Sequence, residues 1–395
     1  MRTASDPTVL LSAARTPVGK FGGALSGVDG PDLGAAAVAA ALERAGGLSP
    51  DQVILGNVIQ AGNGQNPARV AATRAGISLT VPALTLNNVC LASMSAVSIA
   101  SSMIQTQQIR TAVVGGFESM SRALHGVQVR QAPRTGDGAL IDLLTRDGLW
   151  CALSDRGMGS LSEDANQQLG IDRASQDALA AASHQRAAAA TQDGRLHDEI
   201  TSVEKVDLHE DEGIRPSTTV EALSHLRPAF VAGGTITAGN SSQMSDAGAA
   251  GVLTSARHAA HLGLEPMVEV LDSAVVAGPD TTLHLKPAAA ARVILERQGL
   301  TAADIDLWEI NEAFSGVVVA CLHALEIDQE RVNVNGGAIA LGHPLGASGF
   351  RLVQTLATQM RRQGAELGIA ALCGGGGQGE AILLRLPARH SQNAP

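Results

Sequence analysis

Residues 84–116 read LTLNNVCLASMSAVSIASSMIQTQQIRTAVVGG. In this stretch an apolar run ends in a polar turn, a series of small residues follows, and a β-branched run then closes on two glycines. Residues 333–377 have the same layout: a loop with GHPLG opens a helical stretch, and GIAALCGGGG follows at 368–377. Strands that alternate with helices predict an α/β fold with a largely parallel sheet. The shared layout also predicts duplication of one α/β unit, with two equivalent loops meeting at one site.

The same reasoning, extended along the chain, predicts the remaining elements. We expect strands at 8–11, 53–58, 112–114, 268–276, 307–310, 367–372 and 381–386, and helices at 33–45, 93–105, 175–190, 247–262, 288–298, 316–325 and 346–360. Between 121 and 245 the pattern loosens, with one good helix and many polar, Gly and Pro breaks. This segment is therefore predicted to be an excursion inserted into the first unit.

Composition excludes several classes of protein. The chain has 395 residues, of which 45% are hydrophobic and 17% charged, so we expect two or three domains with ample cores. A net charge of −10 argues against nucleic-acid binding. Because the sequence has neither a long apolar run nor a signal-peptide pattern, we expect no membrane span and a cytoplasmic location. The acidic run at 210–212 is most simply a solvated turn.

The cysteines are too few and too scattered for a disulfide framework or a zinc site. Cys90 follows a polar turn and precedes a helix, where N–H groups and the helix dipole lower a thiol pKa. We expect Cys90 to be a nucleophile; the alternative is a buried, unreactive cysteine. Cys373 precedes four glycines, which let a ligand approach closely and expose N–H donors. The alternative for this run is a flexible turn, and a dinucleotide site is disfavoured because a strand follows.

His343 lies between glycine and proline on a loop, and an ordinary histidine pKa of about 6.5 suits proton transfer. Asn311 follows a strand in WEINEAF, where its amide could hold a water or an oxyanion. With Cys90 and Cys373 these residues form a coherent set. One thiolate could carry an acyl group and the other could move a proton, while His343 activates the first thiol.

Motifs along essentially the whole chain resemble those of the thiolase family and occur in the family's order. They are ARTPVGKFGGAL (14–25), NNVCLASMSAV (87–97), GGFESMSR (115–122), DEGIRPSTT (211–219), LRPAF (226–230), GTITAGNSSQMSDAGAA (234–250), INEAFS (310–315), NVNGGAIALGHPLGASG (333–349) and LCGGGGQG (372–379). The resemblance is greatest to the acetyl-CoA acetyltransferase group. It implies two duplicated α/β units with mixed sheets and helices in α-β-α-β-α layers. The implied domains are an N-terminal one (1–120 with 246–266), an inserted loop domain that binds coenzyme A (121–245), and a C-terminal one (267–395).

The resemblance also implies a reaction, the reversible Claisen condensation of two acetyl-CoA molecules to acetoacetyl-CoA and coenzyme A. Cys90 would be acetylated after His343 takes its proton, and Cys373 would remove a proton from the methyl group of the second acetyl-CoA. Asn311 would hold a water that forms one oxyanion hole with His343. The N–H groups of Cys90 and Gly375 would form the other.

The resemblance further implies residues that bind the substrate, with Arg215 near the nucleotide end of coenzyme A. The residues implied for coenzyme A and acyl binding are Arg215, Ser242, Ala238, Leu149, Met158 and Phe314. The chain departs from the family pattern at Gly157, where a histidine is common, and at Ala222, where a serine is common. Val275 is interpreted as occupying the position at which many acetyl-specific family members have a methionine that limits the size of the acyl group. A degradative 3-ketoacyl-CoA thiolase of fatty-acid β-oxidation is therefore the alternative function.

Two further classes are disfavoured. A non-catalytic thiolase-like binding protein would lack reactive residues that this chain has, and a ketoacyl synthase would use two histidines with one cysteine. The resemblance implies no permanently bound cofactor or metal, coenzyme A as substrate and product, and no nucleic-acid or membrane partner. It also implies a homotetramer built from dimers, and a role in lipid and fatty-acid metabolism.

Overall fold

The computed structural model describes residues 6–131 and 135–387, and a ten-stranded mixed sheet organises this part of the chain. The strand order is β12-β13-β14-β11-β1-β10-β5-β3-β4, and β2 pairs with β10. The strands are β1 (Thr8–Arg15), β2 (Gly19–Lys20), β3 (Gln52–Gly56), β4 (Ala83–Leu86), β5 (Thr111–Ser119), β10 (Ser245–Ser255), β11 (Val268–Ala277), β12 (Leu307–Ile310), β13 (Leu367–Gly374) and β14 (Gln378–Arg385). The strands predicted from the sequence are all present.

The two halves of the sheet have the same topology. In the first half β1, β10 and β5 are antiparallel neighbours, and β3 joins β5 in parallel. In the second half β11, β14 and β13 are antiparallel neighbours, and β12 joins β13 in parallel. This repeat confirms the predicted duplication, and the short antiparallel pairing of β1 with β11 joins the halves. The prediction of a largely parallel sheet is wrong, because most neighbouring strands described here are antiparallel.

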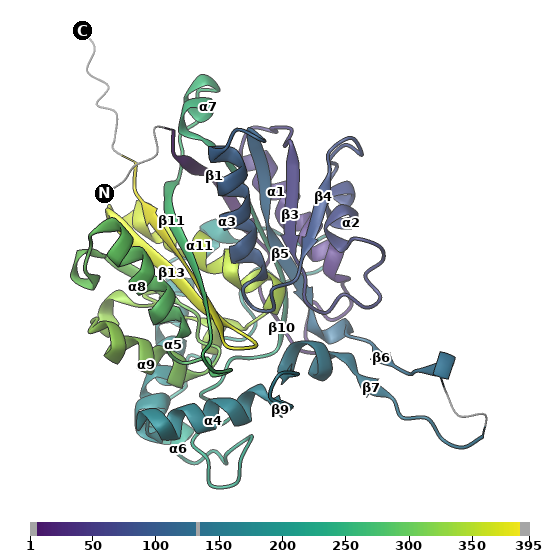
Figure 1. Ribbon diagram of the computed structural model, residues 1–395, viewed down its shortest axis with the longest axis vertical. Coiled ribbons are helices and arrows are strands. Elements are labelled where there is room, and N and C mark those ends of the chain that lie inside the picture. The colour runs from purple at the N-terminus through teal and green to yellow at the C-terminus, as the bar shows by residue number, and fades with distance from the viewer. Residues whose placement is uncertain (1–5, 132–134, 388–395) are drawn as a thin grey trace.

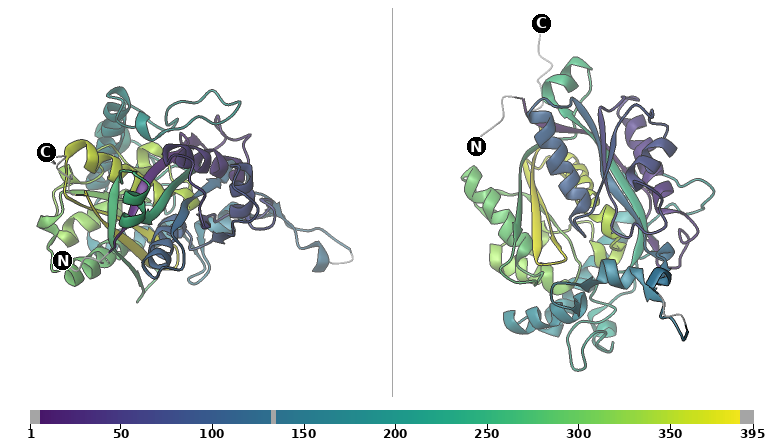
Figure 2. Two further views of the ribbon diagram at one scale, coloured as in Figure 1. Left: turned by 90° about the horizontal axis from the view of Figure 1, so that it is seen from above. Right: turned by 45° about the vertical axis from the view of Figure 1, so that its right-hand side comes forward.

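Helices cover both faces of each half. Helices α3 (Ala92–Gln105) and α11 (Leu345–Gln363) pack against each other between the two halves, around a core that includes Met94 and Phe350. Helices α1 (Gly30–Arg44) and α2 (Pro67–Arg74) cover the outer face of the first half, and α8 (Lys286–Gln298) and α9 (Ser315–Leu325) that of the second (Figures 1 and 2). This arrangement has the α-β-α-β-α layers that the resemblance implies.

The helix predicted at 247–262 is wrong, because most of that range forms the central strand β10, and only α7 (Ala256–His261) is helical. Because β10 is rich in alanine and glycine, helices can pack closely against it. A Cβ on Gly248 would lie 2.2 Å from the Leu33 carbonyl oxygen, and one on Gly251 would lie 2.4 Å from the Phe350 ring. Small residues in this strand therefore let α1 and α11 approach opposite faces of the sheet.

The inserted segment forms a separate layer at one end of the sheet (Figure 1). It contains α4 (Met158–Leu169), α5 (Arg173–Gln192) and α6 (Val220–Ser224), and the strand pairs β6 (His125–Gly126) with β7 (Ile141–Asp142) and β8 (Trp150–Cys151) with β9 (Arg156–Gly157). Helix α5 confirms the one helix predicted there. The β6–β7 arm projects from the body of the molecule (Figure 1).

A buried ion-pair cluster fastens the inserted segment to β1. Arg15 Nη1 donates to Asp211 Oδ1 at 2.7 Å, and Arg15 Nε donates to Glu199 Oε2 at 2.8 Å. The expectation of a solvated acidic turn at 210–212 is therefore wrong for Asp211, which is buried. Of the helices in the described ranges, none is long and apolar enough to cross a membrane.

Candidate active site

A cavity of about 70 Å³ lies where loops of both sheet halves meet the inserted segment. It is lined by Val89, Cys90, Gly148, Leu149, Met158, Ser242, Leu283, Ala313, Phe314, His343, Leu345, Cys373 and Gly375. The loop before α3 supplies Cys90, and the loop between α10 (Ala338–Leu341) and α11 supplies His343. The predicted meeting of the two equivalent loops at one site is thus confirmed.

The nucleophile candidate Cys90 lies in a tight turn directly before α3. The Leu91 N–H donates to the Asn88 carbonyl at 3.1 Å, and the Ala92 N–H donates to the Val89 carbonyl at 3.0 Å. Val89 has a φ of 49°, in the left-handed region that β-branched residues rarely occupy. Strained backbone of this kind is concentrated at functional sites, and here it immediately precedes the cysteine.

The main-chain N–H groups of Gly375 and of Cys90 itself favour the thiolate form of Cys90 and lower the pKa of its thiol. Burial, with a smaller contribution from the charge of Glu118, nevertheless raises the pKa of the Cys90 thiol to about 12. The prediction of a lowered pKa is wrong, because desolvation outweighs the donors at the start of the helix. The thiol is therefore protonated in the free protein, and a base must take its proton when the sulfur attacks.

Cys373 is buried at the end of β13, beside Cys90. Burial raises the pKa of the Cys373 thiol well above its usual value, and negative charge on Cys90 raises it further. Because the two thiols influence each other in this way, a proton or a charge on one changes the proton affinity of the other. The pair is suited to a reaction in which one sulfur carries an acyl group while the other exchanges a proton.

The imidazole of His343 is buried between two polar side chains. Its Nδ1 lies 2.6 Å from Ser348 Oγ, and its Nε2 lies 3.4 Å from Asn311 Nδ2. Burial, with a smaller contribution from the positive charge of Arg351, lowers the pKa of His343 to about 3. The sequence led us to expect an ordinary loop histidine, whereas this one is neutral at pH 7 and can therefore accept a proton.

Asn311 follows β12, where its N–H donates to the Ala371 carbonyl at 3.0 Å. Within the described residues its buried side-chain oxygen, Oδ1, has no hydrogen-bond partner. A buried carbonyl oxygen without a partner is costly, so Oδ1 is poised to accept from a donor that enters the site.

The residues expected to bind the substrate fall into two groups. Leu149, Met158, Ser242 and Phe314 line the cavity, with Leu149 at the end of a π-helical turn. Arg215 and Ala238 are exposed and are not among the described residues that line it. They lie on the inserted segment and its return to the sheet, outside the part of the site that holds the reactive groups.

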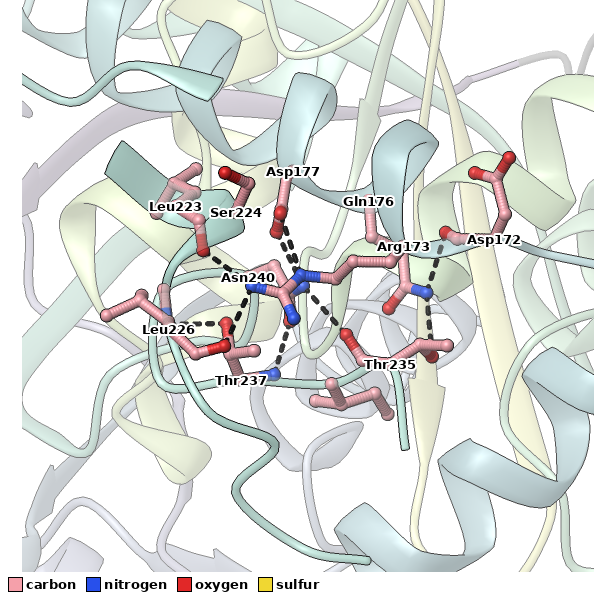
Figure 3. A network of polar contacts seen from close by, with 12 residues as sticks. Asp172, Arg173, Gln176, Asp177, Leu223, Ser224, Leu226, Thr235, Thr237 and Asn240 are labelled. Carbon is pink, nitrogen blue, oxygen red and sulfur yellow. Dashed lines mark hydrogen bonds and ion pairs between the residues drawn. The ribbon is translucent and has the colours of Figure 1, made fainter. Parts of the chain in front are cut away.

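A buried polar network holds the segment that carries Ala238 and Ser242 against α5 (Figure 3). Asn240 Nδ2 donates to Asp177 Oδ1 at 2.9 Å, and Asn240 Oδ1 accepts from the Thr237 N–H at 2.8 Å. Arg173 Nε donates to the other oxygen of Asp177 at 2.7 Å. Because α5 belongs to the inserted segment, this network fixes one wall of the site to the layer that covers it.

The interpretation of Val275 as an acyl-pocket residue is wrong. Val275 lies on β11 with 53% of its surface exposed, and the cavity is lined instead by Leu283, which is 4% exposed. Leu283 packs in one cluster with Phe314 and Cys373. Sequence reasoning missed Leu283 because it stands in TTLHLK, where no motif marks it.

Glu118, at the end of β5, is a second residue that sequence reasoning missed. Its carboxylate is fully buried and accepts from the side chain of Asn57 and from the N–H groups of Val58, Ile59 and Gly346. Burial raises the pKa of Glu118 to about 7. The available signal was an acidic residue in the motif GGFESMSR, directly after an apolar strand. No group of three or more His, Cys, Asp or Glu side chains suited to a metal ion occurs in the described residues.

Comparison with known proteins gives a consistent result. Residues 8–257 match the model of the thiolase N-terminal domain, and residues 264–386 match that of the thiolase C-terminal domain. A probable acetyl-CoA acetyltransferase of Mycolicibacterium smegmatis is 45% identical over 387 residues, which cover 95% of this chain and 100% of the relative. The acetyl-CoA acetyltransferase of Escherichia coli is 43% identical over 386 residues, which cover 95% and 98%.

Proposed function

This chain belongs to the thiolase family of acyltransferases, and on that premise we propose that it catalyses the reversible condensation of two acetyl-CoA molecules to acetoacetyl-CoA and coenzyme A. One observation carries the proposal: Cys90 and His343, which come from two loops, and Cys373, which lies at the end of β13, line the same cavity. The acetyl-CoA acetyltransferases among the relatives support the choice of acyl group.

The first half-reaction transfers the acetyl group to the protein. The Cys90 sulfur attacks the carbonyl carbon of acetyl-CoA while its proton passes to Nε2 of His343. The main-chain N–H groups of Cys90 and Gly375 lower the pKa of the Cys90 thiol, and in this proposal they also donate to the negative oxygen that develops beside the sulfur. The carbon–sulfur bond to coenzyme A then breaks, and the departing thiolate takes the proton of Cys373. The products are acetyl-Cys90, a Cys373 thiolate and a protonated His343.

The second half-reaction makes the carbon–carbon bond. The Cys373 thiolate removes a proton from the methyl group of the second acetyl-CoA, and protonated His343 and a donor held by Asn311 stabilise the enolate oxygen. The enolate carbon attacks acetyl-Cys90 and releases acetoacetyl-CoA. The Cys90 thiolate then regains the proton from His343, so both cysteines and the histidine return to their initial states.

A direct test is to incubate the protein with acetyl-CoA and to locate the acetyl group by peptide mass spectrometry. We expect a thioester adduct on Cys90, which His343→Ala slows by at least about 10²-fold, the usual contribution of a general base. Cys321→Ala, which changes a buried cysteine of α9, is the control and should acetylate normally. An adduct on Cys373 with Cys90 unmodified would contradict the proposed roles.

The preference for short acyl groups follows from the shape of the cavity. Leu283, Phe314 and Met158 surround the space next to the two cysteines, and the cavity is small. The argument for the degradative alternative depended on Val275, which does not line this space. We therefore propose acetoacetyl-CoA as the best substrate for thiolysis. The ratio of kcat/KM for acetoacetyl-CoA to that for an eight-carbon 3-ketoacyl-CoA tests this choice, and a ratio below one would favour the 3-ketoacyl-CoA thiolase.

The proposal also covers the domains of the protein, its oligomeric state and its location. The inserted domain, 121–245, would hold coenzyme A with Arg215 near its phosphates, between an N-terminal domain of 1–120 with 246–266 and a C-terminal domain of 267–395. We propose a cytoplasmic homotetramer in lipid and fatty-acid metabolism, with acetyl-CoA, acetoacetyl-CoA and coenzyme A as its small-molecule partners and no permanently bound cofactor. Analytical ultracentrifugation of the purified protein tests the tetramer.

A further inference from the structure

The histidine of the site has one polar side-chain neighbour at each ring nitrogen. Ser348, one turn into α11, lies with its Oγ 2.6 Å from His343 Nδ1, and both residues are buried. The Ser348 hydroxyl is also 2.9 Å from the Pro344 carbonyl oxygen, which lies four residues earlier. On the opposite side of the ring, the Asn311 amide nitrogen is 3.4 Å from Nε2.

The hydrogen bonds that link Pro344, Ser348 and His343 determine which ring nitrogen of the imidazole carries the proton. A serine hydroxyl has one proton to donate, and a carbonyl oxygen only accepts. When Ser348 donates to the Pro344 carbonyl, its oxygen receives the Nδ1–H of His343. Nε2 then carries a lone pair, to which the NH₂ group of Asn311 can donate. In the opposite tautomer an Nε2–H group would face that NH₂ group, with a donor against a donor.

The same contact determines which nitrogen is available for chemistry. Because Ser348 occupies Nδ1, the nitrogen left to face Asn311 and the site is Nε2. A neutral imidazole must have its lone pair on that nitrogen in order to take a proton from Cys90. When it does so, Nδ1–H still has an acceptor in Ser348, whereas burial and the charge of Arg351 both oppose protonation. An acceptor held at Nδ1 therefore favours both the reactive tautomer and the imidazolium.

We propose that Ser348 is a positioning residue that holds His343 in the Nδ1–H tautomer and so makes Nε2 the base of the reaction. This inference rests on the proposed role of His343 in acetyl transfer, and it assigns to Ser348 a role that packing alone would not require. The geometry is that of a catalytic histidine oriented by a partner on its second nitrogen.

Kinetics of three variants of the whole protein test the proposal. In Ser348→Ala we expect kcat for thiolysis of acetoacetyl-CoA to fall roughly 10–100-fold, as happens when a histidine loses an orienting partner, with KM for coenzyme A nearly unchanged. Ser348→Thr keeps the hydroxyl and should recover most of the loss. Ser162→Ala is the matched control, because Ser162 is a buried helical serine whose hydroxyl has no partner among the described residues. A Ser348→Ala enzyme with wild-type kcat would overturn the proposal.

Nitrogen-15 NMR of histidine-labelled protein provides a second measurement, which does not depend on activity. The signals of His343 are identified by their loss in His343→Gln. We expect the wild type to show a protonated Nδ1 and an unprotonated Nε2, and Ser348→Ala to show a mixture of tautomers. A wild type with Nε2 protonated would overturn the inference. If His343→Gln still acetylates Cys90 at the wild-type rate, the proposed function fails instead.

Discussion

Glu118 accepts a hydrogen bond of 3.0 Å from the main-chain N–H of Gly346, which lies at the start of α11 and three residues after His343. The same carboxylate accepts from the N–H groups of Val58 and Ile59, so it joins the end of the first sheet half to the loop of the second. A negative group at the N-terminus of a helix is favourable, and here it also fixes where the helix and its histidine begin.

Replacing Glu118 with glutamine should therefore lower both the stability of the protein and its activity. The amide presents an NH₂ group where the carboxylate had only acceptors, so at least one main-chain N–H loses its partner, at a cost of about 1–3 kcal/mol. We expect a lower free energy of unfolding in urea and a reduced kcat. Glu43→Gln, an exposed change on α1, is the control and should alter neither. An unchanged kcat in Glu118→Gln would mean that the loop is held by other contacts.

Cys373→Ser should separate the two half-reactions. A serine hydroxyl is a much weaker acid than a thiol, so we expect condensation to fall by at least about 10²-fold. Cys90 should still be acetylated, because the thiolate of coenzyme A can leave without the proton of Cys373, whereas the methyl group of the second substrate cannot lose its proton without a base. A stopped-flow burst of coenzyme A release measures the first step, and formation of acetoacetyl-CoA measures the second. Loss of the burst together with condensation would show that Cys373 is not a separate acid and base.

Leu283→Ala should widen the acyl pocket, whereas Val275→Ala should not. Each methylene that a hydrophobic pocket accepts or rejects changes the free energy of binding by about 1–3 kcal/mol. The kcat/KM for six- and eight-carbon 3-ketoacyl-CoA, relative to acetoacetyl-CoA, should therefore rise by about tenfold or more in Leu283→Ala alone. An equal change in both variants would indicate an effect on the sheet and not on the pocket.

Arg215→Ala should raise KM for coenzyme A substrates more than it lowers kcat. The guanidinium is exposed and lies away from the reactive groups, so contacts with the distant phosphates would contribute equally to the ground and transition states. Arg74→Ala removes an exposed arginine of α2 and serves as the control. A loss of kcat at constant KM would argue against a role in binding the nucleotide.

Because of Glu380, the free energy of unfolding should fall as the pH rises from about 4.5 to 7. This buried carboxylate accepts from the hydroxyl groups of Ser95 and Ser98, but burial raises its pKa to about 7. The folded protein therefore binds a proton that the unfolded chain releases in this range, and a tenfold difference in proton affinity corresponds to about 1.4 kcal/mol. Thermal unfolding of Glu380→Gln should depend less on pH there, with exposed Glu296→Gln as the control. Identical pH profiles would show that Glu380 does not titrate in this range.

The alternation of strands and helices around 84–116 and 333–377 was sufficient to predict the duplicated architecture, because local propensity and topology agree in those stretches. The pattern failed at β10, whose alanines and glycines have the composition of a helix. The choice between helix and strand there depends on how closely α1 and α11 must approach, and that is a tertiary property. The antiparallel pairing of β14 with β11 and β13 could not be predicted from the sequence either, because strand pairing is also a tertiary property.

In the site, motifs identified the residues that we propose carry the chemistry, and Cys90, His343 and Cys373 line one cavity. Two residues that act through shape or burial, Leu283 and Glu118, were missed. Leu283 is an ordinary apolar residue outside any motif, and Val275 was chosen in its place by its position along the chain. The pKa of Cys90 was predicted in the wrong direction, because a sequence contains the helix start but not the depth of burial.

Helices α3 and α11 approach closely enough at Gly349 to bring main-chain atoms together. A Cβ on Gly349 would lie 2.6 Å from the Met94 nitrogen, and one on Gly116 would lie 2.0 Å from the Gly346 carbonyl oxygen. The spacing between the helix that follows Cys90 and the helix that follows His343 is consequently set by backbone contact. One added methyl group at Gly349 would therefore push α3 and α11 apart, and with them the side chains of Cys90 and His343.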